Sequence, residues 1–271
     1  MSKKTYRRVM TVAGSDPSGG AGVQADIKTI SACGCFATSA IVAVVDENTV
    51  GVTGIHPIPV DFVVGQIHSI LDDIGTDAVK IGMLHSSELI VAVYDVLREY
   101  PDIKNIVLDP VMVATSGDAL LQSDAVDSLR EVLIPHSRVI TPNIPEAEIL
   151  LGKPIEFQDQ LPDAAKELAR LGTSVFLKAG HLSDKELIDI FYNAETGETI
   201  RLTSERLETV NTHGTGCTLS SALASYLALG HTLNDSAKLA KKYINDAIVA
   251  GAKYNIGHGH GPVHHFHSFW S

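Results

Sequence analysis

A glycine-rich turn, "HGTGC", runs directly into a segment with an apolar face at helical spacing. The consecutive backbone N–H groups of Gly214, Thr215, Gly216 and Cys217 would then lie at the positive end of a helix, where anions bind. A transferring phosphoryl group suits such a turn. Because a helix N-terminus favours the thiolate, we also expect the pKa of the Cys217 thiol to be lowered.

A second group of polar residues stands where predicted strands end. Asp109 closes "VLD" and Lys178 closes "SVFLK". Asn143 and Glu146 stand three apart in "TPNIPEAE", which leaves another strand. Side chains at the carboxyl ends of strands in an open α/β sheet share the ligand crevice. The two acids offer hard oxygens of the kind that Mg²⁺ binds together with waters and substrate phosphates, and Lys178 is placed to offset triphosphate charge.

Another glycine-rich stretch, "AGSDPSGGAGVQAD" (13–26), follows a predicted strand and opens a predicted helix. It lacks the Gly-Lys-Ser/Thr of a Walker A loop and the glycine spacing of a dinucleotide fingerprint, so it is a weak signal for phosphate. Its glycines let a ligand approach the backbone closely, and Asp26 is placed to accept hydrogen bonds from a polar substrate. The alternative is a tight strand-to-helix turn in which Asp26 is a solvated acid.

The elements that must position these residues follow from hydrophobic periodicity. Short apolar runs alternate with segments of helical period, which predicts an α/β fold with a mainly parallel sheet covered on both faces. Strands are predicted at 8–13, 38–45, 78–83, 105–109, 138–141 and 174–179. Helices are predicted near 21–33, 60–74, 87–99, 123–133, 145–151 and 161–171.

The last third of the chain has a different pattern. "LIDIFYN" and "ETIRLT" predict an antiparallel hairpin with Gly197 in its turn. The helix after the 213–217 turn is expected to stop at Gly230, and a further helix to begin with Asn234 or Asp235 as its N-cap.

Composition limits the class of protein. The chain has 271 residues, 45% of them hydrophobic, which is enough for one α/β domain spanning 1–271. A net charge of −11 without a basic tract argues against nucleic-acid binding, and no apolar run approaches the roughly 18 residues of a membrane span. Three cysteines do not make a disulfide framework, so we expect a reducing cytoplasm.

Taken together, the motifs resemble a known family. "AGSDPSGGAGVQADIKT", "KIGML", "LDPVM", "TPNIPEAE", "NTHGTGCTLSSALA" and "GPVHHFH" are similar, in this order, to the bacterial hydroxymethylpyrimidine and hydroxymethylpyrimidine phosphate kinases of thiamine biosynthesis, over about residues 8–267. The resemblance implies a three-layer α/β/α domain of the ribokinase-like fold, usually a homodimer. It also implies ATP-dependent phosphorylation of 4-amino-5-hydroxymethyl-2-methylpyrimidine and its monophosphate, with Mg²⁺.

The resemblance also implies roles for individual positions. The 213–217 turn would form the anion hole, with Cys217 where sugar kinases of the wider fold carry an aspartate base. Asp109 and Glu146 would serve Mg²⁺, Asn143 belongs to the same nucleotide-side motif, and Lys178 would lie near the phosphates. The positions that would line the pyrimidine pocket are Gly14, Ala21, Asp26, Val44, Met83 and Val111.

One position departs from the family pattern. After the second strand the pyrimidine kinases read "AQNT", whereas this chain reads "VVDENTV" with Glu47 in place of the glutamine. A carboxylate can accept from an exocyclic amine, but it offers no donor to a ring nitrogen unless one partner is protonated. We expect Glu47 to read the pyrimidine through a shared proton.

Three other functions remain open from the residues. A pyridoxal kinase of the same branch differs mainly around Glu47. A cysteine-nucleophile hydrolase could use Cys217 with His213 as its base, but it leaves the acids unexplained. A non-catalytic pyrimidine or nucleotide sensor would not need acids, turn and cysteine together. The stretch 113–121, "VATSGDALL", is predicted to be a mobile lid.

Overall fold

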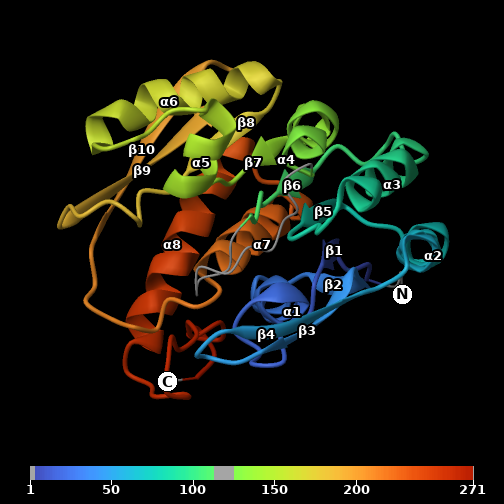
Figure 1. Cartoon of the computed structure of the whole chain (residues 1–271), viewed down its shortest axis with the longest axis horizontal. Helices are drawn as coiled ribbons and strands as arrows, with labels where there is room; N and C mark the ends of the chain where they lie inside the picture. The colour runs from blue at the N-terminus through green and yellow to red at the C-terminus, as the bar shows by residue number, and fades with distance from the viewer. Residues whose placement is uncertain (1–3, 113–124, 271) are drawn as a thin grey trace.

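A computed structural model describes residues 4–112 and 125–270, and a twisted sheet runs through their centre (Figure 1). In these residues eight strands pair in the order β10-β9-β8-β7-β6-β5-β1-β2. The parallel strands are β1 (Arg8–Ala13), β2 (Phe36–Ile41), β5 (Ala78–Ile81), β6 (Ile106–Leu108), β7 (Val139–Ile140) and β8 (Ser174–Leu177). The predicted hairpin forms one edge as β9 (Glu186–Asn193) and β10 (Glu198–Glu205).

Helices cover both faces of the sheet, which confirms the predicted three-layer architecture (Figure 1). One face packs against α2 (Val60–Asp73), α3 (Ser87–Arg98), α4 (Ala125–Ser128) with the π-helical turn Leu129–Leu133, α5 (Ile144–Leu151) and α6 (Leu161–Leu168). The other face packs against α1 (Gly22–Ala32), α7 (Thr215–Ala228) and α8 (Leu233–Gly251). Short 3-10 turns lie at Ile134–His136, Gln158–Gln160 and Ala169–Leu171. None of the described helices is long and apolar enough to cross a membrane.

The predicted strand 38–45 is instead two strands. β2 ends at Ile41, and β3 (Ala43–Glu47) leaves the sheet to pair antiparallel with β4 (Val52–Pro57) as a separate two-stranded ribbon. The sequence did not predict β4, because the segment contains a glycine and a proline and lacks the apolar alternation of a half-buried strand. The ribbon lies near the carboxyl end of β1, where Ser15 N donates to Ala43 O (2.9 Å).

The helix caps were predicted only in part. α7 ends as expected just before Gly230, which has a φ of 91°. However, α8 begins at Leu233, and its N-cap is Thr232, whose side chain accepts from Asp235 N. The prediction that Asn234 or Asp235 is the cap was therefore wrong by two to three residues.

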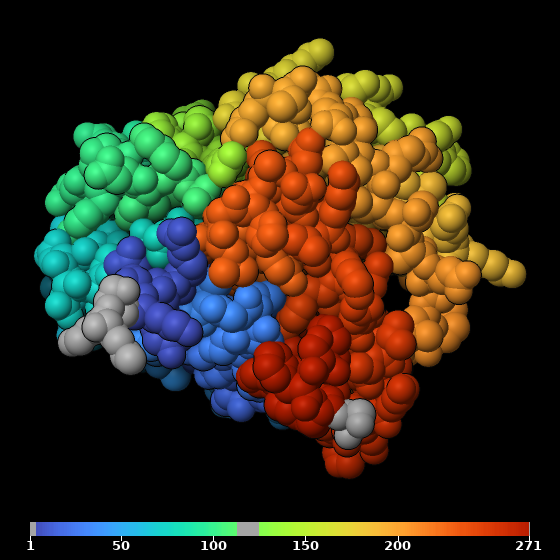
Figure 2. Space-filling model, turned by 180° about the vertical axis from the view of Figure 1, so that it is seen from behind, coloured from blue at the N-terminus to red at the C-terminus, as the bar shows by residue number. Residues whose placement is uncertain are grey.

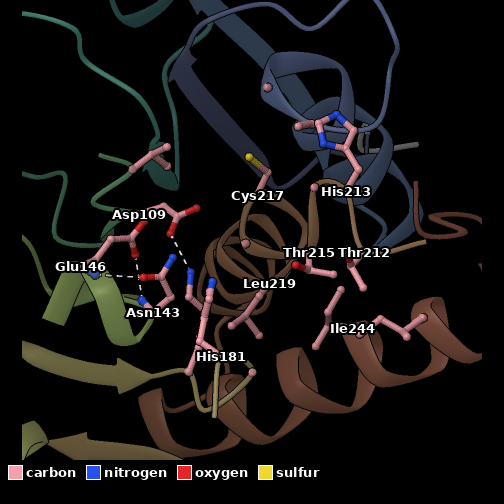
Figure 3. A pocket seen from close by; sticks show the side chains of 18 of the residues that line it. Asp109, Asn143, Glu146, His181, Thr212, His213, Thr215, Cys217, Leu219 and Ile244 are labelled. Atoms are coloured by element: carbon pink, nitrogen blue, oxygen red, sulfur yellow. Dashed lines mark hydrogen bonds and ion pairs between the residues drawn. The ribbon is translucent and has the colours of Figure 1, made fainter. Parts of the chain in front are cut away.

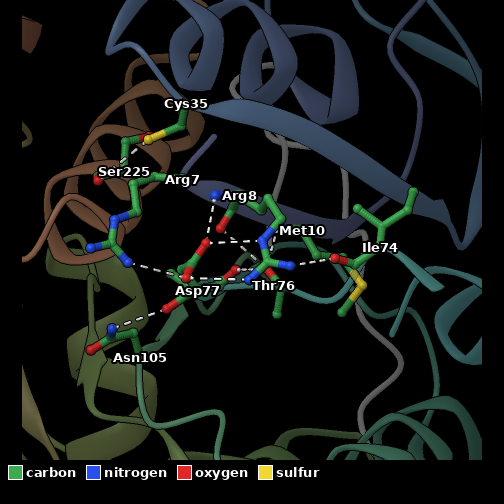
Figure 4. Close-up of polar contacts among 10 residues, drawn as sticks. Arg7, Arg8, Met10, Cys35, Ile74, Thr76, Asp77, Asn105 and Ser225 are labelled. Carbon is green, nitrogen blue, oxygen red and sulfur yellow. Dashed lines mark hydrogen bonds and ion pairs between the residues drawn. The ribbon is translucent and has the colours of Figure 1, made fainter. Parts of the chain in front are cut away.

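At the amino end of the parallel strands, Asp77 joins β1 to the turn before β5 (Figure 4). Its Oδ2 accepts from Arg8 N (2.8 Å) and Arg8 Nε (3.1 Å), while Arg7 lies 3.5 Å from Oδ1. The guanidinium of Arg8 also donates to Ile74 O at the end of α2. Burial opposes the charge of Asp77, but these donors and the two arginines hold its pKa below the usual range. This cluster holds together the amino ends of β1 and β5. It lies at the opposite edge of the sheet from the carboxyl ends of the strands.

The centre of the fold contains a fully buried ion pair between Lys80 on β5 and Asp26 on α1. Lys80 Nζ lies 2.9 Å from the Asp26 carboxylate, which also accepts from Thr11 Oγ1 (2.6 Å) on β1 and Ser221 Oγ (2.7 Å) on α7. Burial opposes the ammonium charge, but Asp26 outweighs burial and raises the pKa of Lys80. Two strands and two helices are therefore joined at one carboxylate.

The C-terminal segment after α8 folds back over the β3–β4 turn. His260 N donates to Thr49 O (2.7 Å), and His264 N donates to Ala247 O (3.0 Å) on α8. Val263 and His265 are buried against the body. Figure 2 shows this segment, in red, lying against the blue N-terminal part of the chain and against α8. It fixes the β3–β4 ribbon to the rest of the molecule.

Removing one partner of the buried pair should destabilise the fold. We expect Lys80→Met or Asp26→Leu to lower the free energy of unfolding by about 3–5 kcal/mol, because each leaves an uncompensated buried charge. The double variant should regain most of that loss. Urea unfolding of the four proteins measures the coupling.

A matched control is Lys242→Met, which removes an exposed ion pair with Asp246 within α8. That variant should change the free energy of unfolding by less than about 1 kcal/mol. Single variants at Lys80 or Asp26 as stable as this control would contradict the central role given to the pair.

Candidate active site

A pocket of about 950 Å³ lies at the carboxyl ends of the parallel strands, bounded also by α7, α8 and the β9–β10 hairpin (Figure 3). It brings together most of the residues singled out in the sequence. These are Gly14, Ala21, Glu47, Met83, Asp109, Val111, Asn143, Glu146, Lys178, Gly214, Thr215, Gly216 and Cys217. The expectation that strand-end residues meet at one edge of the sheet is therefore confirmed.

Asp109, which is buried, and Lys178, which is partly buried, form an ion pair on one side of this pocket (Figure 3). Lys178 Nζ lies 3.2 Å from Asp109 Oδ1, which also accepts from Thr141 Oγ1 (2.9 Å). Ser220 Oγ on α7 donates to Asp109 Oδ2 at 3.4 Å. Burial disfavours the ammonium charge, yet Asp109 and then Glu146 outweigh it and raise the pKa of Lys178. Lys178 thus stays a cation inside the pocket.

Asn143 and Glu146 form a capping box at the start of α5. Asn143 Oδ1 accepts from Glu146 N (2.9 Å), and Glu146 Oε2 accepts from Asn143 N (2.8 Å). Their spacing of three residues thus has a local structural reason as well as a place in the pocket. Burial raises the pKa of Glu146 to about 7, although Lys178 opposes that rise.

The acids suit a divalent cation with hard-oxygen preference. Asp109 and Glu146 are both buried, both line the pocket, and both offer carboxylate oxygens. Burial makes negative charge costly there, as the raised pKa of Glu146 reflects, and a cation would offset that cost. The donor set fits Mg²⁺, which binds through one or two carboxylates and waters.

The two glycine-rich turns touch each other. Gly214 has a φ of 77°, and a Cβ there would lie 1.7 Å from Gly20 O. A Cβ on Gly216 would lie 3.2 Å from Lys178 Nζ and 3.3 Å from Asp109 Oδ2. The start of α7 thus presents bare backbone beside the Lys178–Asp109 pair. Because the first N–H groups of a helix have no partner within it, they are the donors available to an anion.

Cys217 differs from the sequence expectation. Its half-buried side chain lies in the pocket, between the Asp109 group and His213 (Figure 3). Burial raises the pKa of its thiol to about 12, although Lys80 and the N–H of Gly22 act in the opposite direction. The predicted lowering is wrong because desolvation outweighs the nearby cation and donor.

Two residues expected in the pyrimidine pocket lie elsewhere. Asp26 is fully buried beneath the pocket, and its oxygens are already bound by Thr11, Ser221 and Lys80. It is a structural anion rather than a substrate acceptor or a solvated acid. Val44 is 51% exposed on the outer side of β3, while its neighbour Val45 lines the pocket, because successive strand residues face opposite sides.

The sequence reasoning missed the role of Asp16 in the first turn. Its carboxylate accepts from the backbone N–H groups of Ser18 (2.8 Å), Gly20 (3.0 Å) and Ala21 (2.6 Å). These donors are therefore bound within the loop rather than offered to a phosphate, which agrees with the weak signal assigned to the motif. An Asp-Pro pair before serine and glycine is the turn chemistry that could have shown this.

His213 joins the two turns from the other side. Its Nε2 lies 2.9 Å from Asp16 Oδ2 and 4.0 Å from Glu47 Oε1. Burial would lower the pKa of His213, but the hydrogen bond and charge of Asp16, and then Glu47, raise it. Burial acts against Asp16 as well, and His213 with the loop donors holds the pKa of Asp16 well below its usual range. The pair is a buried ion pair at the end of the pocket away from Asp109.

The remaining wall is apolar and was not predicted. It combines side chains from β9, the stretch after β10, α7 and α8 with Thr212 at the entrance to the turn (Figure 3). The apolar side chains are Leu187, Leu207, Leu219, Ile244, Ile248 and Val249. They come from four segments far apart in the sequence, so no local motif marks them. The predicted lid, 113–121, lies outside the described residues.

The Asp16–His213 pair should make stability depend on pH. His213, with a raised folded pKa, contributes fully below its unfolded value of about 6.5, and this contribution is lost as pH rises through the folded pKa. Asp16, with a lowered pKa, contributes above about 3.9 and loses its contribution as pH falls toward the folded pKa.

We therefore expect His213→Gln to lower the free energy of unfolding by about 1.5–3 kcal/mol near pH 6. As the pH rises above about 6, the free energy of unfolding of this variant should fall less steeply than that of the wild type. Urea unfolding from mildly acidic to alkaline pH measures both effects. His56→Gln, at an exposed histidine on β4, is the control. Parallel pH curves for wild type and His213→Gln would refute the charged pair.

Comparison with known proteins identifies the family. The model of the phosphomethylpyrimidine kinase family matches residues 16–264. The chain is 45% identical over 263 residues to a hydroxymethylpyrimidine/phosphomethylpyrimidine kinase of Rhizobium meliloti (strain 1021), covering 96% of this chain and 97% of the relative.

Solved structures agree with this match. A phosphomethylpyrimidine kinase from Clostridium difficile 630 is 40% identical with a TM-score of 0.78, covering 89% of this chain and 99% of that one. The ADP complex of Bacillus subtilis pyridoxal kinase is 34% identical with a TM-score of 0.87, covering 96% and 98%. The resemblance read from the motifs is confirmed, and the chain belongs to the phosphomethylpyrimidine kinase family.

Proposed function

We propose that this kinase transfers the γ-phosphoryl group of ATP to the hydroxymethyl oxygen of 4-amino-5-hydroxymethyl-2-methylpyrimidine, and then to the monophosphate of that product. The observation that carries the proposal is the position of the Gly214–Cys217 turn. It lies between the Lys178–Asp109 pair at one end of the pocket and Glu47 at the other. A phosphate bound at this turn would be within reach of ligands on both sides.

The side chains that line the pocket indicate where the nucleotide would bind. The apolar side chains of α7, α8 and the hairpin suit a flat purine ring, whereas Lys178 and the start of α7 suit phosphates. The Bacillus subtilis neighbour is an ADP complex with a TM-score of 0.87, which supports a nucleotide in this fold. Asn143 lies on the same side as Lys178, with Pro142 O accepting from Lys178 N (2.9 Å).

Transfer of a phosphoryl group passes through a loose transition state, so positioning and charge neutralisation supply most of the rate. The backbone N–H groups of Gly216 and Cys217 would bind the transferred group, and Lys178 would neutralise its charge. Asp109 and Glu146 would hold Mg²⁺ through oxygens and waters. When bound, this ion would neutralise phosphate charge and orient the triphosphate.

Cys217 has a role that fits a neutral thiol. Its pKa of about 12 counts against a resting thiolate base. In a loose transition state the attacking hydroxyl loses its proton only late in the reaction. A weak hydrogen-bond acceptor is therefore enough to orient its oxygen. We infer that the side chain of Cys217 orients that hydroxyl and that its backbone N–H donates a hydrogen bond to the phosphate.

The alternatives differ in how they use the pocket. A pyridoxal kinase would keep the same phosphate apparatus, and the pyridoxal kinase neighbour has the higher TM-score of the two structures compared, 0.87 against 0.78. A hydrolase would need His213 as a base for Cys217, but His213 Nε2 is bound to Asp16. A sensor would leave the acids and Lys178 without a purpose.

The acceptor can be identified by ADP release from MgATP. Hydroxymethylpyrimidine, its monophosphate, pyridoxal and ribose are offered separately, with a reaction lacking acceptor as control. We expect turnover on both pyrimidines. Turnover on pyridoxal alone would keep the mechanism and replace the substrate, and silence on all four would favour the sensor.

Loss of the Cys217 side chain should slow chemistry more than nucleotide binding. We expect Cys217→Ala to lower kcat by about 10²-fold through misplacement of the attacking oxygen, with the nucleotide Kd changed by less than about threefold. Cys33→Ala, at a cysteine outside the pocket, should retain full activity. Wild-type turnover by Cys217→Ala would mean that only the backbone of the turn matters.

A further inference from the structure

Three ionisable side chains meet at the substrate end of the pocket. Asp16, Glu47 and His213 each offer a possible ligand or proton-binding atom, and these atoms lie within 4.8 Å of one another. Their side chains are 1%, 14% and 6% exposed. Such proximity under low solvent exposure means that their protonation states depend on one another.

The proton positions follow from the neighbouring acceptors. Asp16 binds three backbone N–H groups and Ser18 Oγ, contacts that favour an anion. His213 Nε2 faces carboxylate oxygens at 2.9 and 4.0 Å, so this nitrogen must carry a proton. One carboxylate from the first loop and another from β3 lie beside the ring, and their charges favour the imidazolium and raise the pKa of His213.

Other charged groups around the cluster do not change this balance. From the C-terminal segment, His265 is buried, and desolvation lowers its pKa to about 3, so it is neutral. From α1, Lys28 donates to Gly19 O (2.7 Å) in the first loop. A cluster of two carboxylates and one imidazolium would carry one net negative charge. A cationic ligand group would neutralise it.

A carboxylate at position 47 would also dictate which hydrogen bonds a ligand makes. A carboxylate only accepts, so two adjacent donors match its two oxygens. A neutral aminopyrimidine offers one donor, its exocyclic amine, next to a ring nitrogen that is an acceptor. Protonation of that ring nitrogen creates two adjacent donors and a positive charge. A glutamine at this position would instead match the neutral ring, because its amide accepts at one atom and donates at the other.

The backbone holds Glu47 firmly enough for such a match. Glu47 lies at an irregularity of the β3–β4 pairing, next to Asp46. The turn beyond it is bound by the C-terminal segment, where a Cβ on Gly259 would lie 2.0 Å from Thr49 O. His260 N and His258 N donate to Thr49 O (2.7 Å) and Thr49 Oγ1 (3.2 Å). The carboxylate is thus carried by a ribbon fixed at both ends.

We propose that Glu47 is the specificity-determining residue of this enzyme and that it selects the ring-protonated, cationic form of an aminopyrimidine, with the proton taken from solvent. The inference rests on the proposed function for its substrate. It differs from that function because it concerns the protonation state of the bound ring and not the transfer of phosphate.

The test uses hydroxymethylpyrimidine with isotopically labelled ring nitrogens, bound to wild type, Glu47→Gln and Asp46→Asn without nucleotide. Nitrogen NMR distinguishes a protonated ring nitrogen from a neutral one by its chemical shift. We expect a protonated ring in the wild-type complex at a pH where the free ligand is neutral, and a neutral ring in Glu47→Gln. Asp46→Asn removes the same charge from an exposed position on the same strand and should behave as wild type.

Binding affinity provides a second readout. Above the pKa of the free ring, the wild-type Kd should weaken by about tenfold per pH unit, because one proton is taken up on binding. The Kd of Glu47→Gln should stay nearly constant over the same range. A neutral ring in the wild-type complex, or parallel pH profiles for the two proteins, would overturn the inference. Absence of binding to all three proteins would instead refute the proposed substrate.

Discussion

The carboxylate of Asp26 is the point on which the architecture of the site depends. It is fully buried, and it can remain so only because β1, β5 and α7 each bring it a donor. The donor on α7 is Ser221, one helical turn after Cys217. The hydrogen bond from Ser221 therefore holds the first turns of α7 against α1, beside the ion pair of the same carboxylate with Lys80. An interaction beneath the pocket thus helps to position the turn at the start of α7.

Charge is distributed along the pocket in two groups. At one end, Asp109 and Glu146 surround Lys178, and at the other, Asp16 and Glu47 surround His213. In each group two acids flank one cation, so each end favours a ligand that brings positive charge. Under the proposed function, a divalent ion would bring that positive charge at the end with Asp109 and Glu146. At the other end the positive charge would come from the proposed acceptor, through protonation of its ring.

The sequence supports prediction of features that depend on local pattern. The acids and Lys178 could be placed together, because parallel strands carry their carboxyl ends to one edge and the strands themselves were evident from apolar runs. The glycine-rich turn at 213–217 could be placed at the start of a helix because the glycines and the apolar helical pattern are adjacent in the chain. Asp26 and Val44 could not be placed correctly. The partners of Asp26 lie 54 and 195 residues further on, and the facing of Val44 depends on where β3 leaves the sheet. Likewise, the pKa of Cys217 depends on burial that the helix start alone does not reveal.

The contact between Gly20 and Gly214 joins the beginning of the chain to a turn formed 194 residues later. During synthesis, β1, α1 and β5 leave the ribosome long before α7, so Asp26 lacks Ser221 while most of the chain is made. Long-range contacts of this kind form late in folding, because loop closure must precede them. The helix that follows the Gly214–Cys217 turn thus completes the hydrogen bonds of Asp26 before α8 packs on the same face of the sheet. Asp26 and the turn at the start of α7 therefore gain their long-range contacts only when this late part of the chain has been made.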